Sequence, residues 1–257
     1  MTFMVDIAHN IAVVRERMAA AEKRAGRQIG SVKLMLAAKY QPVENLLAAF
    51  AAGERLLGHN MIQQLESAEE GLAAAAADGS ALRAGVTDLT HTTTVIGHVQ
   101  SNKLSHAMRY AQRIDTVDTL KTAQQIARRQ QARIDAGETQ AGQAYPILLQ
   151  VNSSGAPTQF GCEPGELIEL AQRISETLPL VRIRGLMTIG ANEPDPAAVI
   201  RSFEITRALS AELRELPGLA EASELSMGMT NDLELAIEHG STEIRIGTAI
   251  FGARPRK

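Results

Sequence analysis

Short apolar runs alternate with longer amphipathic patterns along the whole chain. Runs rich in Leu and β-branched residues are typical of buried strands, and segments with apolar residues three or four positions apart are typical of helices. The predicted strands are 32–38, 54–58, 93–97, 114–117, 146–151, 182–188, 223–227 and 243–248. The predicted helices are 1–24, 43–52, 60–77, 101–111, 119–134, 164–178, 196–215 and 231–239. The strict alternation indicates repeated βα units around a parallel sheet.

Eight strands with seven intervening helices in 257 residues favour a single (β/α)8 barrel domain, residues 1–257, with an extra N-terminal helix. An open doubly wound sheet is the alternative. A glycine-rich phosphate loop would be expected after its first strand, and the chain has none there. The sequence therefore predicts an α/β protein of the TIM-barrel class.

Composition narrows the function classes. The net charge of -3 and the 3% aromatic content, with no Trp, offer neither the basic surface nor the stacking rings of a nucleic-acid binder. No apolar run approaches the roughly 20 residues of a membrane span, and the charged N-terminus does not resemble an export signal. A single cysteine, Cys162, excludes an internal disulfide and is expected to be a partly buried thiol. We expect a cytoplasmic protein.

Lys39 ends the first predicted strand, in the stretch 33-KLMLAAKYQP-42. Catalytic groups of a barrel lie at the C-terminal ends of its strands. Apolar surroundings lower the pKa of an ammonium group, and a neutral amine attacks aldehydes to form Schiff bases. A lysine at a strand end is also commonly a solvated side chain. Position alone leaves both interpretations open.

The last two strands carry residues suited to a phosphate group. Gly247 and Thr248 follow the eighth strand, and Ser226 and Thr230 flank a glycine after the seventh. Turn N–H groups and hydroxyls at this place commonly bind phosphate in barrels. Ordinary helix capping by Thr230 or Asn231 is the alternative for the second of these segments.

An aldehyde-reactive lysine on the first strand and a phosphate site on the last two fit pyridoxal 5'-phosphate, because this cofactor carries both groups on one ring. The eighth strand closes against the first in a barrel. Arg245 precedes Gly247 by two residues and would point into the same space. A permanently charged arginine facing the ring nitrogen keeps that nitrogen unprotonated.

Six segments resemble the successive motifs of the pyridoxal-phosphate homeostasis proteins. They are LMLAAKYQP, 58-GHNMIQQ-64, 96-IGHVQSNK-103, 185-GLMTIGA-191, 225-LSMGMTND-232 and 244-IRIGTAIFGAR-254. The resemblance runs from about residue 30 to the C-terminus. It implies a barrel similar to the N-terminal domain of alanine racemase and to the fold-type III decarboxylases, which binds the cofactor without established turnover.

The resemblance also assigns roles to single residues. It makes Lys39 the Schiff-base lysine, places Asn60 in the cofactor pocket and sets Arg245 opposite the ring nitrogen. The phosphate would be held by Ser226, Thr230, Gly247 and Thr248, and the pocket would be lined by Met227 and Met229. The chain departs from the family pattern at Tyr40, His59, Met61, Gln64 and Gln159.

We therefore expect a monomeric carrier that buffers pyridoxal 5'-phosphate and delivers it to apo-enzymes. The chain ends nine residues after Thr248, so we expect no C-terminal domain to supply a second acid or base. The alternative is an amino-acid racemase or lyase of fold-type III that uses His59, His98 or Tyr40 as its second proton carrier. A phosphate-sugar barrel enzyme without a Schiff base is a third candidate.

Overall fold

The computed structural model describes residues 5–191, 193 and 195–252, and the predicted elements are found within them. Residues 1–4 of the predicted N-terminal helix and the end of the last motif, 253–254, lie outside the described residues. The strands are β1 Lys33–Ala37, β2 Leu56–His59, β3 Thr92–Val95, β4 Arg113–Val117, β5 Tyr145–Gln150, β6 Val181–Met187, β7 Glu224–Ser226 and β8 Glu243–Ile246.

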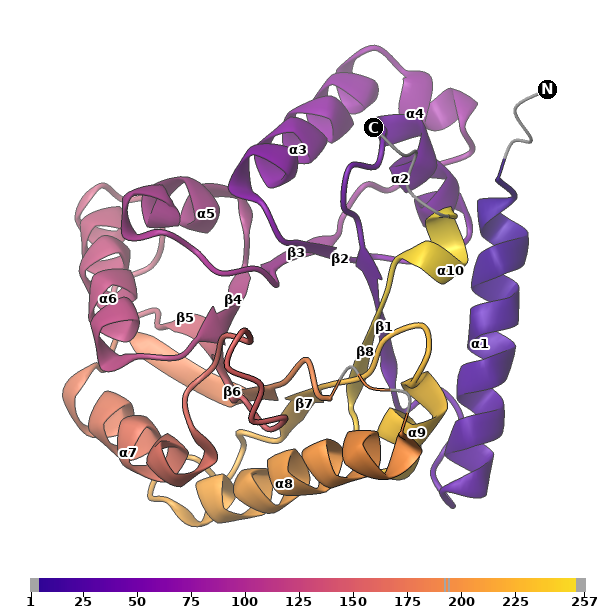
Figure 1. Cartoon of the computed structure of the whole chain (residues 1–257). Coiled ribbons are helices and arrows are strands. Elements are labelled where there is room, and N and C mark those ends of the chain that lie inside the picture. Colours follow the sequence, from indigo (N-terminus) through magenta and orange to yellow (C-terminus); the bar gives the residue numbers. More distant parts are fainter. Residues whose placement is uncertain (1–4, 192, 194, 253–257) are drawn as a thin grey trace.

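Helices follow the strands and surround them (Figure 1). The helices are α1 Ile7–Arg24, α2 Val43–Ala51, α3 Ile62–Ala77, α4 Ser80–Arg83, α5 Leu104–Tyr110, α6 Leu120–Asp135, α7 Leu167–Thr177, α8 Pro196–Glu215, α9 Leu233–Glu238 and α10 Thr248–Phe251, with 3-10 turns η1 Ser101–Lys103 and η2 Pro164–Glu166. The short helix α4 lies between the predicted helix 60–77 and the predicted strand 93–97.

The strands are parallel and pair in chain order, and β8 pairs with β1 to close the barrel. In that closing pair Met35 lies beside Arg245, and Leu36 beside Ile246. This confirms the predicted (β/α)8 barrel with an extra N-terminal helix. The strand boundaries differ from the predicted ones by a residue or two, because apolar patterning continues into the turns that flank a strand.

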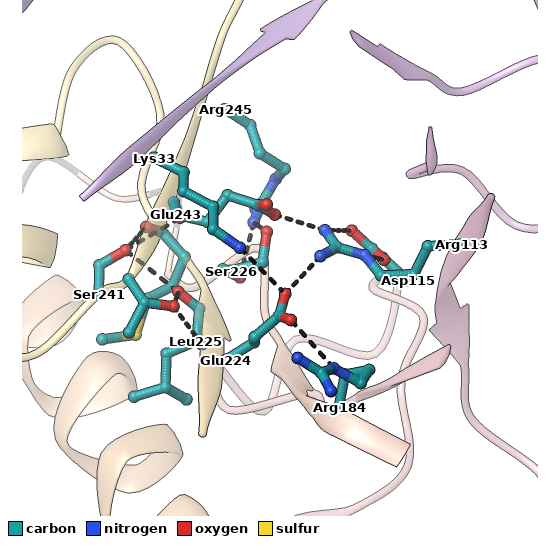
Figure 2. Close-up of polar contacts among 12 residues, drawn as sticks. Lys33, Arg113, Asp115, Arg184, Glu224, Leu225, Ser226, Ser241, Glu243 and Arg245 are labelled. Carbon is teal, nitrogen blue, oxygen red and sulfur yellow. Dashed lines mark hydrogen bonds and ion pairs between the residues drawn. The ribbon is translucent and has the colours of Figure 1, made fainter. Parts of the chain in front are cut away.

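Strand residues alternate between the helix layer and the barrel interior. On β1 and β8, Leu34, Leu36, Ile244 and Ile246 belong to an apolar core shared with the surrounding helices. The intervening positions, such as Arg245, face the interior, where charged side chains meet (Figure 2). The two faces of each strand therefore serve different purposes: one packs the helices and the other builds the interior.

Helix α1 covers the outer side of β1 and β8 and packs against α9 and α10 (Figure 1). Its buried side chains, Ile7, Ile11, Val14 and Met18, recur every three or four residues and join the same apolar core. Burying each of them contributes roughly 1.5–3 kcal/mol. The N-terminal helix thus occupies the sector of the barrel wall between α9 and α2.

Glu22, near the end of α1, fixes the connection to β1. It is 1% exposed, and its carboxylate accepts hydrogen bonds from the Gly30 and Val32 N–H groups at 2.8 and 2.7 Å and from the Ser31 hydroxyl at 3.2 Å. A buried carboxylate requires such donors, because desolvating it without partners is costly. The side chain therefore sets the path by which the chain enters the barrel.

We expect Glu22→Ala to lower the free energy of unfolding by about 3 kcal/mol, because it leaves the buried Val32 N–H and the partly buried Gly30 N–H without their acceptor. Urea denaturation measures the change. Glu16→Ala, at an exposed position of the same helix, is the control and should change stability by no more than about 0.5 kcal/mol. Equal effects of the two substitutions would contradict this role of Glu22.

Candidate functional site

A cavity of about 230 Å³ opens at the C-terminal ends of β1, β7 and β8. Among its lining residues are Lys39, Met229, Thr230, Arg245, Gly247 and Thr248. Barrel closure brings these residues together from opposite ends of the chain. Six of the nine residues predicted to bind the cofactor or line its pocket therefore share one cavity: Lys39, Met229, Thr230, Arg245, Gly247 and Thr248.

Lys39 lies two residues past the end of β1, in a tight turn, and is partly buried. Its N–H donates to the Ala37 carbonyl at 2.9 Å. The next residue, Tyr40, has a φ of 56° and is the non-glycine residue with positive φ among those described. This left-handed conformation costs about 1–3 kcal/mol and persists only where neighbouring contacts hold it.

The contacts that hold the Lys39 turn come from two glutamines. The Tyr40 N–H donates to Gln64 Oε1 at 3.2 Å, and Gln41 Nε2 donates to the Lys39 carbonyl at 3.1 Å. Gln64 is one of the positions that depart from the family pattern, and here it tethers the turn to α3. The backbone of Lys39 is thereby fixed relative to β1 and β2.

Arg245 lies in the barrel interior beneath the cavity and is 5% exposed. Its guanidinium donates to the Ser226 carbonyl at 2.6 Å, the Ser226 hydroxyl at 3.0 Å and the Thr188 carbonyl at 2.8 Å. Burial lowers the pKa of Arg245, and the nearby Glu243 carboxylate opposes that shift. The hydrogen bonds fix the direction in which this cation points.

A layer of paired charges supports Arg245 from below (Figure 2). The Arg113 guanidinium donates to Asp115 at 2.5 and 2.8 Å, to Glu224 at 2.5 Å and to Glu243 at 2.7 Å. Burial raises the pKa of Asp115 to about 7, although Arg113 acts in the opposite direction. Sequence reasoning missed this layer. The sequence does carry a sign of it: charged and apolar residues alternate in β4 and β8. In a barrel strand, such alternation directs the charged side chains to the interior.

The loop between β7 and α9 forms another wall of the cavity. The Met229 N–H donates to Asp232 Oδ1 at 2.5 Å, and the Asp232 N–H donates back to the Met229 carbonyl at 3.3 Å. Burial raises the pKa of Asp232. Asp232, rather than Thr230 or Asn231, is the N-cap of α9. Thr230 is therefore not the capping residue, and it lines the cavity.

Gly247 and Thr248, at the start of α10, form a further part of the cavity wall. Gly247 is the N-cap of α10, and a Cβ atom added to it would lie 3.1 Å from the Ala37 carbonyl oxygen. The close approach of β1 and β8 thus favours glycine here. Because the first N–H groups of a helix have no partner within it, the turn from Gly247 to Thr248 presents polar hydrogens near the cavity.

Three of the predicted binding residues lie outside the cavity lining: Ser226, Met227 and Asn60. Ser226 is beneath Arg245 as its hydrogen-bond acceptor. Met227 is fully buried in the apolar core between barrel and helices. The prediction that its side chain lines the pocket is therefore wrong. The physical reason is strand alternation: Ser226 faces inward, and its neighbour must face outward. Met229 lies beyond the end of β7, in the loop before α9, where strand alternation no longer applies, and it lines the cavity.

Asn60 follows β2 and is partly buried. Its Oδ1 atom is buried and, within the described part of the chain, has no hydrogen-bond partner. A Cβ atom at Gly97 would lie 2.2 Å from the Asn60 carbonyl oxygen, so that glycine permits the close approach of the two loops. An orphaned buried acceptor is costly in itself, and it suits a polar group of a ligand.

His59, the neighbour of Asn60, points away from the interior toward the helix layer. It is 1% exposed, and burial lowers its pKa to about 4, with Glu69 of α3 opposing the shift. His91 contacts the same carboxylate, with Nε2 3.1 Å from Glu69 Oε1. His59 is therefore a neutral residue of the wall, and its position does not suit proton transfer in the cavity.

The remaining positions that depart from the family pattern, and His98, the other candidate proton carrier, lie in segments that follow the strands. The His98 ring stacks on Phe160 with centroids 4.5 Å apart, and Gln159 Nε2 donates to the Gly190 carbonyl at 3.0 Å. Tyr40 is 58% exposed, and its hydroxyl donates to Met61 Sδ at 3.4 Å. None of the four positions, His98, Gln159, Tyr40 and Met61, belongs to the lining of the described cavity.

No group of three or more His, Cys, Asp or Glu residues within residues 5–191, 193 and 195–252 is placed to hold a metal ion. In the same part of the chain, no helix has the length and apolar character needed to cross a bilayer. Cys162 is buried, and burial raises the pKa of its thiol to about 12.

The barrel and its cavity define a class of protein. Residues 5–255 match the family model described as alanine racemase, N-terminal domain. The fold is also that of alanine racemase from Clostridium difficile, with a TM-score of 0.70 at 14% identity, covering 98% of this chain and 57% of the other.

Relatives of higher identity narrow the class. The chain is 36% identical to the pyridoxal phosphate homeostasis protein of Pseudomonas aeruginosa, over 98% of this chain and 97% of the relative. It is 35% identical to that of Escherichia coli K12, over 98% of each. The chain belongs to the family of pyridoxal phosphate homeostasis proteins, as the six motifs indicated.

A solved structure of PipY from Synechococcus elongatus, with PLP bound, is similar to this one. The TM-score is 0.76 at 29% identity, and the match covers 96% of this chain and all of the other. An unknown protein from Bifidobacterium adolescentis has a TM-score of 0.84 at 38% identity, covering 96% of this chain and 94% of that one. The similarity thus extends over nearly the whole barrel.

We expect the stability of the protein to fall as the pH falls from about 6.5 toward 4, because the unfolded chain then binds a proton at His59 that the folded protein excludes. The slope from this residue is about 1.4 kcal/mol per pH unit. His59→Leu should flatten the profile in this window, as measured by urea denaturation at several pH values.

His106→Gln is the control for this effect. His106 is largely exposed, and its Nδ1 lies 3.6 Å from Glu66 Oε1, so its substitution removes no buried side chain and should change stability by no more than about 0.5 kcal/mol at any of these pH values. The burial of neutral His59 would be refuted by parallel profiles of wild type and His59→Leu.

Proposed function

We propose that this protein binds pyridoxal 5'-phosphate, carries it as a Schiff base on Lys39, and buffers and delivers it within the cell. The observation that carries the proposal is that Lys39 lines the same cavity as Arg245, Thr230 and Thr248. An amine and a set of anion-binding groups thus meet in one small space. The names of the relatives support the same ligand.

The residues of the cavity fit this cofactor. The Thr230 and Thr248 hydroxyls and the N–H groups of the Gly247 turn would hold the phosphate. Asn60 Oδ1 is a buried acceptor without a hydrogen-bond partner in the described chain, and it would take a polar group of the ligand. Arg245, fixed by its bonds to Ser226 and Thr188, would face the ring nitrogen.

Lys39 and Arg245 decide what the bound cofactor does here. When bound, pyridoxal 5'-phosphate supplies an aldehyde conjugated to a ring that withdraws electrons. The Lys39 amine condenses with that aldehyde and releases water, and hydrolysis reverses the attachment. Arg245 stays charged and cannot give its proton to the ring nitrogen, so the electron-withdrawing power of the ring is weak. This favours storage over turnover of amino acids.

The positions of the histidines support the carrier role over a racemase or lyase. His59 faces the helix layer and His98 stacks on Phe160, so neither belongs to the cavity lining. Asp232 is the carboxylate of that lining, and its Oδ1 already accepts the Met229 N–H. A two-base reaction would lack a free proton carrier among these groups.

We further propose that the protein works as a monomer in the cytoplasm and hands the cofactor to apo-enzymes. Reversible attachment through a Schiff base suits delivery, because hydrolysis releases the aldehyde and water is the only reactant that it requires.

We expect Lys39→Ala to abolish the Schiff-base absorbance band that appears when the cofactor is added to the protein. Borohydride reduction and peptide mapping should place the label on the peptide that contains Lys39. Lys33→Ala is the matched control: Lys33 lies at the other end of β1, with 59% of its side chain exposed, and its loss should leave the band intact. A band that survives in Lys39→Ala would refute the assignment.

A second measurement separates a carrier from an enzyme. Incubation of the loaded protein with a panel of amino acids in heavy water should give no deuterium at the α carbon on the time scale of enzyme turnover, roughly 1 s⁻¹ or faster. Rapid exchange with any amino acid would make the protein a racemase or lyase instead.

A further inference from the structure

Helix α1 contacts the two chain segments proposed to bind the phosphate: the loop that contains Thr230, and α10, which begins at Thr248. Arg17 donates from Nη2 to the Thr230 carbonyl at 3.0 Å, and Asn10 donates from Nδ2 to the Ile250 carbonyl in α10 at 2.9 Å. Asn10 and Arg17 are seven residues apart, which places them on one face of the helix, two turns from each other. A helix of the outer layer thus reaches the backbone of both segments.

Arg17 makes the more elaborate contact of the two. Besides the Thr230 carbonyl, it donates from Nε and Nη2 to the two carboxylate oxygens of Glu234 at 2.7 and 2.9 Å. A bidentate pair fixes the guanidinium plane as well as its position. Glu234 lies in the first turn of α9, so one side chain joins the start of that helix to the loop that precedes it.

The contact matters because it restrains the middle of the loop, whose start is held by the Arg245 N–H, which donates to the Gly228 carbonyl at 3.0 Å. Its internal hydrogen bonds join Met229 and Asp232, and Thr230 lies between them. The Thr230 carbonyl is held from outside by α1. A group that binds an anion must be held within a fraction of an ångström, and freedom in its loop lowers affinity because the loop must then be ordered on binding.

We propose that Arg17 is a positioning residue for the phosphate group of the ligand: it holds the Thr230 loop in the conformation that binds a dianion. Arg17 does not touch the ligand itself. Asn10 acts in the same way on α10, which begins at Thr248. This inference rests on the proposed function and adds that the N-terminal helix is part of the phosphate site.

Arg24 provides a matched control on the same helix. It is seven residues beyond Arg17, on the same face, and pairs with Glu238 at the end of α9 at 2.7 Å. Substituting Arg24 removes an ion pair between the same two helices without touching the cavity loop. Its substitution therefore reports the general effect of loosening α1.

The test is the affinity of the full-length protein for pyridoxal 5'-phosphate and for pyridoxal, which lacks the phosphate. Arg17→Met keeps most of the apolar stem and removes the donors. We expect it to weaken binding of pyridoxal 5'-phosphate about tenfold, as is usual for groups that orient a binding residue, and to leave pyridoxal binding within about twofold of wild type.

Three further variants sharpen the result. Arg24→Met should change neither affinity by more than about twofold. Arg17→Lys should restore part of the lost affinity, because an ammonium reaches the carbonyl or the carboxylate but lacks the bidentate geometry. Asn10→Ala, which acts on the other side of the cavity, should also weaken the phosphorylated ligand selectively.

The inference is overturned if Arg17→Met binds pyridoxal 5'-phosphate as tightly as wild type, or if it weakens both ligands equally, which would mean a general structural role. Failure of the proposed function has a different signature: wild type itself would show no Schiff-base band with the phosphorylated ligand, or Lys39→Ala would bind as wild type does.

Discussion

The pairing of the first strand with the last is the constraint on which the site depends. Hydrogen bonds between β1 and β8 place Met35 beside Arg245 and Leu36 beside Ile246. Everything that follows either strand is therefore brought to one point of the barrel mouth. Lys39 and the Gly247 turn become neighbours in this way, although about two hundred residues separate them in the chain. Without closure the amine and the anion-binding groups would lie on opposite edges of an open sheet.

Closure also creates a dry interior, and the chain fills part of it with charge. Arg113 contacts three carboxylates, and Arg245 is held by neutral carbonyls and a hydroxyl instead. Burying ions is costly unless each has partners, so the two arginines are stabilised differently. Arg113 forms ion pairs with the carboxylates of its layer, whereas the hydrogen bonds of Arg245 go to neutral acceptors and the carboxylates act on it without direct contact. Arg245 can therefore interact with a ligand in the cavity, whereas Arg113 supports the layer of charges beneath it.

The outer wall contributes to the site as well. Helix α1 occupies the sector beside β8, and its apolar stripe joins the core around β1 and β8. Its polar side chains reach the backbone of the cavity loops. The same helix therefore stabilises the closing strand pair and restrains the segments that follow it. Stability of the barrel and geometry of the cavity depend on one packing arrangement.

The sequence by itself determined the strands, the barrel and the placement of Lys39, Arg245, Gly247 and Thr248 at strand ends, because hydrophobic periodicity and parallel topology are local patterns with few solutions. It did not reveal that Met227 and His59 face the helix layer, that Arg113 anchors an interior charge layer, or that Arg17 reaches Thr230. Those features depend on strand register and on contacts between residues far apart in the chain. A one-residue change of register reverses every side chain on a strand, so only the folded barrel decides which of two neighbours meets the ligand.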